Sequence, residues 1–218
     1  MNTLLLFGGG GHCLTVIDAL CACDYDKIGI VDNEKGPGQK LQGIPVVGCD
    51  AEISHLRAAF DCAFISFGGI NLLHKRRILA KRLEALAFDF PIIIHGKSSV
   101  STGSDISAGV LIGAMAVVNA ACKVGRHCIL NTGCIIEHNC IVEPFAHIAP
   151  RAVLCGNVKI GAGSHIGAGS VIREGVSIGA NTIIGMGAIV TKNMPDNVVA
   201  YGNPCEVVRI NPGSDASR

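Results

Sequence analysis

An aliphatic side chain recurs at every sixth position over almost half of this 218-residue chain. The seventeen positions are Ile94, Val100, Ile106, Ile112, Val118, Val124, Leu130, Ile136, Val142, Ile148, Leu154, Ile160, Ile166, Ile172, Ile178, Ile184 and Val190. A period of six fits neither the 3.6-residue turn of an α-helix nor the two-residue alternation of a strand, and it is typical of β-helices. We therefore expect coils of about 18 residues, each with three short strands whose aliphatic residues point to the axis, stacked about 4.8 Å apart.

Small residues and glycines accompany this repeat. A small residue lies two positions before most of the aliphatic ones, as in Ala116, Cys122, Cys128, Cys134, Cys140, Ala146, Ala152, Ser164, Ser170, Thr182 and Ala188. Glycine follows several of them, as in Gly113, Gly125, Gly161, Gly167, Gly179 and Gly185. We expect the small residue to let a corner close and the glycine to supply a positive φ there. Since no hexad is interrupted, an active site here must use outward-pointing side chains, and we expect it to combine more than one subunit.

Composition narrows the classes of partner. The net charge is +1 and only 16% of the residues are charged, which argues against nucleic acid or an anionic membrane surface as a partner. The sequence has no run of eighteen apolar residues and no basic segment before its first apolar stretch. A cytoplasmic protein with no membrane partner is the resulting expectation.

The chain has eleven cysteines, but their spacing favours a structural role. Four of them occupy the small-residue position of the hexad, where cysteine serves as a small hydrophobe: Cys122, Cys128, Cys134 and Cys140. There is no CxxC motif; Cys21 and Cys23 form a CxC on an expected helix. We expect no metal site, with zinc or redox chemistry as the alternative.

The first ninety residues follow another pattern, in which strands and helices alternate. Strands are expected at Thr3–Phe7, Lys27–Val31 and residues 62–66, and helices at 13–22, 51–59 and 71–87. This alternation indicates a small parallel α/β domain over residues 1–90, followed by the β-helix over 91–197 and a C-terminal tail over 198–218.

A glycine-rich loop closes the first strand of this domain. Residues 8–12 read Gly-Gly-Gly-Gly-His and precede a helix, so free backbone N–H groups and the helix dipole could hold a phosphate. Asp32 follows about twenty residues later, where an acid could bond a ribose hydroxyl. Because Cys13 replaces the third glycine of a dinucleotide fingerprint, a nucleotide or nucleotide-sugar is favoured over NAD. A glycine turn without a ligand is the other alternative.

Together these two halves resemble the sugar O- or N-acyltransferases of the sialic acid O-acetyltransferase type, which include N-acetyltransferases acting on nucleotide-linked 4-amino sugars. The motifs that carry the resemblance are Phe7 to His12, Val31-Asp32-Asn33, Asn131-Thr132-Gly133, Glu137-His138-Asn139, Gly156-Asn157-Val158, Thr191 to Asp196, and Gly202-Asn203-Pro204. The resemblance covers residues 1 to about 210. It implies a half-Rossmann α/β domain, a left-handed parallel β-helix, acetyl-CoA as co-substrate, and a homotrimer with active sites between subunits.

By this resemblance His138 is the general base, a role that suits a side chain titrating near neutrality. Asn139 stands where the family often has Asp or Glu; an amide can orient an imidazole but does not raise its basicity as a carboxylate does. A carboxylate could instead come from Glu137 or from a neighbouring subunit. His147 matches a position near the acetyl-CoA thioester. It lies half a coil beyond His138, so the two should not share a face within one subunit, whereas His165, one coil beyond His147, should stack on it.

The resemblance also implies binding residues. The cofactor groove would run along His147, Gly156, Ala168 and Met186, and Lys192 would meet the CoA phosphates. The nucleotide-sugar would contact Gly10, Gly11, His12, Asp32, Asn33 and Gly68. The basic helix expected at 71–87 could attract the diphosphate, although a run of charges on a helix is more often its solvated face.

We therefore expect an acetyl-CoA-dependent N-acetyltransferase acting on the 4-amine of a nucleotide-linked amino-deoxy sugar, by direct attack with His138 as base. O-acetylation of a sialic acid or another sugar hydroxyl is the nearest alternative. A nucleotide-sugar-binding scaffold without catalysis and a small NAD-binding oxidoreductase are the alternatives from other classes.

Overall fold

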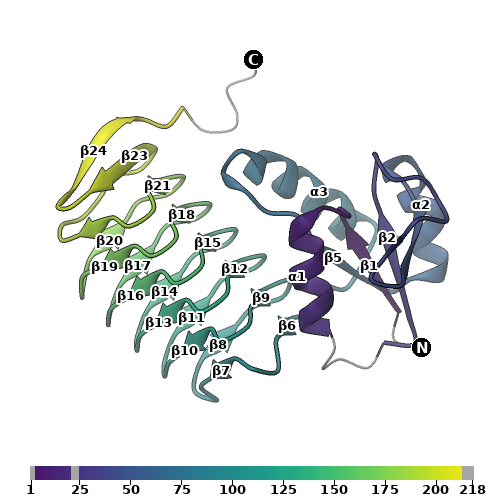
Figure 1. Cartoon of the computed structure of the whole chain (residues 1–218), viewed down its shortest axis with the longest axis horizontal. Coiled ribbons are helices and arrows are strands. Elements are labelled where there is room, and N and C mark those ends of the chain that lie inside the picture. Colours follow the sequence, from purple (N-terminus) through teal and green to yellow (C-terminus); the bar gives the residue numbers. More distant parts are fainter. Residues whose placement is uncertain (1–2, 21–24, 213–218) are drawn as a thin grey trace. The chain divides into compact units, whose positions relative to one another are not determined.

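The computed structural model describes residues 3–20 and 25–212 (Figure 1). The chain divides into two compact units, Met1–Ile93 and Ile94–Arg218. The Cys21-x-Cys23 pair and the expected end of the first helix fall outside the described residues. None of the helices within residues 3–20 and 25–212 combines the length and the apolar character that crossing a bilayer requires.

A five-stranded sheet forms the centre of the first unit, in the order β3-β4-β2-β1-β5. Its strands are β1 (Thr3–Phe7), β2 (Lys27–Val31), β3 (Lys40–Leu41), β4 (Ile44–Gly48) and β5 (Cys62–Ile65). β1 pairs in parallel with β2 and β5, and all five of its residues are buried, as expected for a central strand covered on both faces. The first two strands match the expected bounds. β3 and β4 were not expected, because Pro45 weakens the strand pattern; it lies next to the short edge strand β3, where proline is tolerated.

Within the described residues of this unit, three helices and three 3₁₀ turns connect the strands. The helices are α1 (Gly11–Leu20), α2 (Ile53–Leu56) and α3 (Leu73–Ala85), and the 3₁₀ turns are η1 (Asp50–Glu52), η2 (Arg57–Ala59) and η3 (Ile70–Leu72). The helix expected over 51–59 is thus mostly wrong: a four-residue α2 lies between two 3₁₀ turns. Glu52 accepts a hydrogen bond from the backbone N–H of Cys49 at 2.9 Å, which fixes the start of this segment.

The second unit is a parallel β-helix made of three sheets. Strands of two residues begin every six residues, and each pairs with the strand three places further along, so that paired residues lie 18 apart, as in Val118 with Ile136. Figure 1 shows these strands stacked in columns. The sheet orders are β22-β19-β16-β13-β10-β7, β20-β17-β14-β11-β8 and β24-β23-β21-β18-β15-β12-β9-β6. The expected architecture and its unbroken frame are confirmed.

The bounds of the short strands follow the hexad from Ile93 to Val190. They are β6 (Ile93–Ile94), β7 (Ser99–Val100), β8 (Asp105–Ile106), β9 (Leu111–Ile112), β10 (Val117–Val118), β11 (Lys123–Val124), β12 (Ile129–Leu130), β13 (Ile135–Ile136), β14 (Ile141–Val142), β15 (His147–Ile148), β16 (Val153–Leu154), β17 (Lys159–Ile160), β18 (His165–Ile166), β19 (Val171–Ile172), β20 (Ser177–Ile178), β21 (Ile183–Ile184) and β22 (Ile189–Val190). Every hexad aliphatic residue from Ile112 onward is at most 3% exposed. Val100 and Ile106 are only partly buried, because the first coil has a neighbouring coil on one side only.

The explanation given above for the glycines is wrong. Positive φ occurs three residues after the aliphatic position, at every sixth residue from Gly109 to Gly187, including Asn139 and Asn157. The glycines that directly follow the aliphatic residue serve another purpose. A Cβ at Gly161 or Gly167 would come within 2.5 Å of backbone atoms in the next coil, so glycine is needed there for close stacking.

The small residues two before the aliphatic position do more than leave room. Several donate a hydrogen bond to a carbonyl oxygen fifteen or thirteen residues further on: Cys122 to Glu137, Cys128 to Glu143, Cys140 to Cys155, Ser164 to Gly179 and Thr182 to Pro195. The four hexad cysteines are thiols, and all four are buried. Thiols and hydroxyls therefore occupy this position as buried donors that link neighbouring coils.

The segment expected as a tail continues the β-helix. β23 (Val198–Gly202) pairs in parallel with β21, and β24 (Cys205–Ile210) returns antiparallel to it. Ala200 and Cys205 join the buried core of the repeat. The hairpin therefore covers the last coil, so a boundary at residue 197 places these core residues in the wrong segment.

Candidate active site

His138 lies on an exposed turn between β13 and β14, at the corner where the six-stranded sheet gives way to the five-stranded one. Its neighbour Asn139 has φ of 61°, a conformation that asparagine tolerates better than most residues. Asn139 Oδ1 lies 3.0 Å from His138 Nδ1. In the tautomer with the proton on Nδ1, that N–H donates to Asn139 Oδ1 and Nε2 has the free lone pair that a base needs.

Gly156 lies one coil beyond His138 and directly under its ring. A Cβ at Gly156 would be 2.6 Å from His138 Cε1 and 2.7 Å from Nε2. Any larger residue would therefore displace the imidazole. Glu137, the carboxylate considered for His138, accepts a hydrogen bond from Asn119 Nδ2 at 2.9 Å, so the side chain that contacts Nδ1 is Asn139.

His147 and His165 stack on the eight-stranded sheet, as expected from their spacing. They are Cα partners in β15 and β18, and their rings meet edge to face at 4.8 Å. Asn131 Nδ2 lies 3.3 Å from His147 Nε2. Burial lowers the pKa of His165, so that side chain is neutral at neutral pH. His138 and His147 belong to different sides of the prism, which agrees with the sequence prediction.

The residues expected along one cofactor groove separate into two sets. Gly156 and Lys192 share the corner of His138, since both follow strands of the six-stranded sheet. Ala168 and Met186 follow β18 and β21 of the eight-stranded sheet, where Met186 is 83% exposed. Within one subunit Gly156 therefore lies at a different corner from Ala168 and Met186, because six-residue steps carry the chain around the prism rather than along one edge.

Lys192 has an ionic partner. Its Nζ lies 2.8 and 2.7 Å from the two carboxylate oxygens of Glu206, on β24. Both side chains are more than half exposed, so the pair is screened by solvent. Part of the positive charge expected to meet the CoA phosphates is thus compensated within the chain.

In the first unit, Asp32 holds the loop that follows β1. Its Oδ2 accepts a hydrogen bond from the backbone N–H of Gly9 at 2.6 Å, and its Oδ1 accepts from those of Glu34 and Lys35 at 2.9 Å. Burial alone would raise the pKa of Asp32, but the three N–H donors outweigh it and lower that pKa. Asp32 therefore orders the glycine loop, a role that its match to a ribose-binding acid did not predict.

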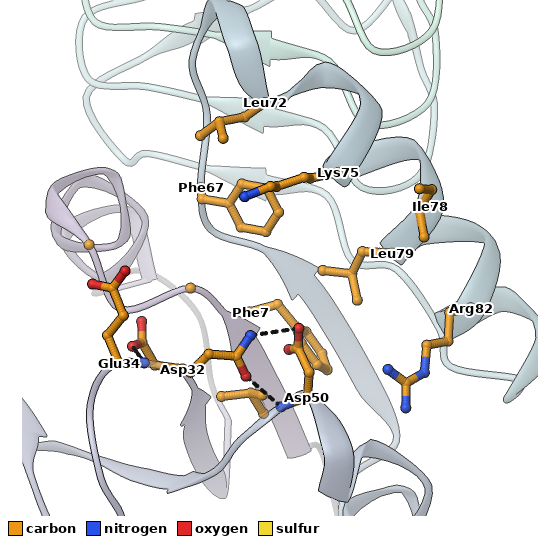
Figure 2. A pocket seen from close by; sticks show the side chains of 14 residues that line it. Phe7, Asp32, Glu34, Asp50, Phe67, Leu72, Lys75, Ile78, Leu79 and Arg82 are labelled. Carbon is orange, nitrogen blue, oxygen red and sulfur yellow. Dashed lines mark hydrogen bonds between the residues drawn. The ribbon is translucent and has the colours of Figure 1, made fainter. Parts of the chain in front are cut away.

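A cavity of about 490 Å³ opens beside this loop, at the carboxyl ends of β1 and β2. Figure 2 shows the loop and Asp32 on one side and α3 on the other. The cavity is lined by Phe7, Gly8, Gly10, Val31, Asp32, Asn33, Glu34, Asp50, Phe67, Leu72, Lys75, Ile78, Leu79 and Arg82. Its volume suits a nucleotide-sized ligand, and its position is that of ligands in open parallel sheets.

Three of the six residues expected to bind the nucleotide-sugar line this cavity: Gly10, Asp32 and Asn33. Gly11, His12 and Gly68 lie outside the lining. Burial, followed by the charge of Arg76, lowers the pKa of His12 to about 4, so it is neutral at neutral pH and adds no positive charge for a diphosphate. A Cβ at Gly10 would meet no protein atom within 4 Å, so the backbone of the loop is open to a ligand there.

The other wall of the cavity comes from the basic helix that the sequence analysis considered for the diphosphate but interpreted as a solvated face. Lys75, Ile78, Leu79 and Arg82 of α3 line it, a face with two cations around an apolar centre. Their spacing of three to four residues places them on one helix face. Asp50 was missed, because it is brought to Asn33 by the fold across 17 residues. In the described part of the chain, no group of three or more His, Cys, Asp or Glu side chains could hold a metal ion.

Comparisons with known proteins extend over both units. A family model described as PglD N-terminal domain matches residues 3–83. A model described as bacterial transferase hexapeptide, with six repeats, matches residues 133–168 and 157–192. A search of curated protein sequences found no significant match.

Solved structures match the chain over nearly its whole length. A mutant of perosamine N-acetyltransferase from Caulobacter crescentus, in complex with CoA and GDP-perosamine, is 31% identical with a TM-score of 0.89, covering 95% of this chain and 97% of that one. The acetyltransferase domain of PglB from Neisseria gonorrhoeae, in complex with acetyl coenzyme A, is 30% identical with a TM-score of 0.88, covering 95% and 100%. WeeI from Acinetobacter baumannii, 22% identical with a TM-score of 0.83, supports the fold.

These matches confirm the left-handed parallel β-helix and the α/β domain before it. The alignment covers 95% of this chain and therefore spans both of its units. The chain therefore belongs to the sugar acyltransferase family that joins a PglD N-terminal domain to a hexapeptide-repeat β-helix.

Proposed function

We propose that the chain is an acetyl-CoA-dependent N-acetyltransferase acting on the 4-amino group of a nucleotide-linked amino-deoxy sugar. The observation that carries this proposal is the full-length match, at 31% identity, to an enzyme named as a perosamine N-acetyltransferase and bound to CoA and GDP-perosamine. Two features of this chain support the proposal: the cavity beside the glycine loop has room for a nucleotide, and the His138 corner exposes an imidazole.

The proposed reaction is a direct transfer. The neutral sugar amine attacks the thioester carbonyl, a tetrahedral intermediate forms, and its collapse breaks the C–S bond and releases the CoA thiol. His138 Nε2 takes the proton that the amine loses and passes it to the leaving sulfur. A backbone N–H donates to the oxyanion. Asn139 Oδ1, 3.0 Å from Nδ1, keeps the ring in the tautomer that this step requires.

We further propose a homotrimer whose active sites lie between subunits. The support is the separation of the expected residues onto different sides of one prism: His138, Asn139, Gly156 and Lys192 at one corner, and His147, Ala168 and Met186 on or after the eight-stranded sheet. One chain cannot bring these sets together around a triangular prism, whereas adjacent copies could. The molecular mass in solution, measured by light scattering, tests this: a stable, active monomer would contradict it.

The chemical class of the product tests the N-acetyl assignment. The full chain is incubated with acetyl-CoA and a panel of nucleotide-linked sugars that carry either a 4-amine or a 4-hydroxyl, and CoA release and product mass are followed. We expect a hydroxylamine-stable amide from the amino sugars only. A hydroxylamine-labile ester would show O-acetylation instead. Binding of the nucleotide-sugar without affinity for CoA and without acetyl transfer would show a non-catalytic binding protein.

A further inference from the structure

The wall of the N-terminal cavity opposite α3 presents hydrogen-bond acceptors. Asn33 Nδ2 donates to Asp50 Oδ2 at 2.9 Å, and the backbone N–H of Asp50 donates to Asn33 Oδ1 at 3.0 Å (Figure 2). These two hydrogen bonds use one N–H of the Asn33 amide and the backbone N–H of Asp50, and they fix the position of the Asp50 carboxylate. Asp32 likewise receives three backbone N–H groups. Asp50 therefore offers a ligand lone pairs rather than N–H groups.

The cations of the cavity come from α3. In Figure 2 Lys75 lies beside Phe67, well separated from Asp50, whereas Arg82 lies at the end of the cavity where Asp50 is. A diphosphate is repelled by the carboxylates of Asp32, Glu34 and Asp50 and attracted by these cations and by the open backbone at Gly10. The nucleobase, which is uncharged, is the part of a nucleotide that suits the Asp50 side.

The bases differ in the number of hydrogen-bond donors that they present to a carboxylate. Guanine presents two adjacent donors, N1–H and the N2 amino group, which match the two oxygens of one carboxylate. Uracil and thymine present one N3–H between two carbonyl oxygens, and both oxygens would face the lone pairs of a carboxylate. An acidic side chain held rigidly by an amide therefore favours guanine over either pyrimidine.

We infer that Asp50, positioned by Asn33, determines the nucleotide specificity of this chain and selects a guanosine diphosphate-linked sugar. This inference rests on the proposed function, since it assumes that the cavity binds the nucleotide. Asp50 would contact the base edge, while Asn33 acts through Asp50. The apolar residues Phe7 and Leu79 line the same cavity and provide nonpolar surface beside the base.

The test is calorimetric titration of the full chain with GDP, inosine diphosphate and UDP. We expect GDP to bind about tenfold or more tightly than either of the others, because inosine diphosphate lacks the N2 donor and UDP offers a single donor. In Asp50→Asn the advantage of GDP over inosine diphosphate should largely disappear, while the affinity for UDP stays within about twofold. Glu34→Gln, which also lines the cavity but is outside the Asn33–Asp50 pair, should keep the GDP preference.

Each other outcome overturns the inference in a recognisable way. UDP binding as tightly as GDP contradicts the guanine assignment but leaves the proposed function intact if amino-sugar transfer is still observed. Equal loss of all three ligands in Asp50→Asn, at an unchanged melting temperature, would show that Asp50 shapes the cavity without reading the base. Failure of all three diphosphates to bind the unaltered protein would overturn the inference together with nucleotide binding at this site.

Discussion

The hydrogen bonds inside the β-helix differ in kind from those inside the α/β unit. In the β-helix the same bonds recur in each coil: backbone N–H groups reach the carbonyls of the next coil, and buried Cys, Ser or Thr donors link coils from one side-chain position. In the α/β unit, single carboxylates order whole loops, as Asp32 does for the glycine loop and Asp50 for the turn after β2. A substitution in the repeat should therefore affect stability, whereas one in the loops should affect binding.

Among the variants proposed here, Gly167→Ala is expected to lower the free energy of unfolding most. Its Cβ would come within 2.5 Å of backbone atoms at Gly185 and Met186, and a rigid stack cannot move away from it. We expect a loss of about 3 kcal/mol in the free energy of unfolding, measured by chemical denaturation. Gly169→Ala is the matched control: it has φ of +66° and open space around it, so the cost should be about 1 kcal/mol. Equal losses would contradict the stacking role of Gly167.

Gly10→Ala should separate binding from stability in the other unit. The new methyl group meets no protein atom within 4 Å, so the melting temperature should not fall. Because Gly10 lines the cavity, the added methyl group should weaken nucleotide-sugar binding about tenfold or more, by calorimetry. Gly11→Ala, next in sequence, equally open and outside the lining, should bind normally. Normal binding by both variants would exclude the loop from the ligand site.

The lowered pKa of His12 leads us to expect that the stability of the α/β unit depends on pH. Its pKa is about 4 in the folded chain, below the ordinary value of 6.5, so between these values the unfolded chain binds more protons. The free energy of unfolding contributed by this group is therefore complete above pH 6.5 and is lost as the pH falls towards 4. His12→Gln should flatten the decline in melting temperature between pH 7 and pH 5. An unchanged slope would show that His12 is not the group responsible.

The smallest effects are expected at the exposed Lys192–Glu206 pair. Removing either side chain should change the free energy of unfolding by less than about 0.5 kcal/mol, because both are solvated. If Lys192 meets the CoA phosphates, Glu206→Gln should lower the KM for acetyl-CoA by about twofold and Lys192→Ala should raise it. Steady-state kinetics with acetyl-CoA as the varied substrate distinguish these; no change in either variant would leave Lys192 without a role in CoA binding.

The repeat could be predicted almost residue by residue, because one physical requirement, an aliphatic side chain on the axis, recurs at a fixed interval. The position of the left-handed turn residues could not, since Met115, Phe145 and Arg151 adopt positive φ although their residue types do not favour it. The one-coil spacing also placed Gly156 next to His138, but it did not predict that the imidazole ring lies over Gly156, because that depends on the orientation of the His138 side chain.

In the α/β unit, only the cavity residues that belong to the glycine loop and to the turn after β2 could be predicted from the sequence. The loop at Gly10 and the turn at Asp32 and Asn33 follow strands recognisable in the sequence, and they line the cavity. No local pattern indicated Asp50, which comes from a connection. The basic pattern of the helix that carries Arg82 was recognised, but which of its faces meets the cavity depends on packing. The predicted role of His12 at the diphosphate is not supported for a similar reason. Its burial, which the sequence did not predict, lowers its pKa and removes its positive charge at neutral pH.

The central claim is that the chemistry is performed at the β-helix corner while the α/β unit binds the nucleotide. The most direct test is acetyl transfer by His138→Ala at saturating acetyl-CoA and nucleotide-linked amino sugar, with nucleotide affinity measured in parallel. We predict that kcat falls by about 10²- to 10⁴-fold while the dissociation constant for the nucleotide stays unchanged. Transfer at a near-normal kcat by a correctly folded His138→Ala would contradict the assignment of His138 as the base.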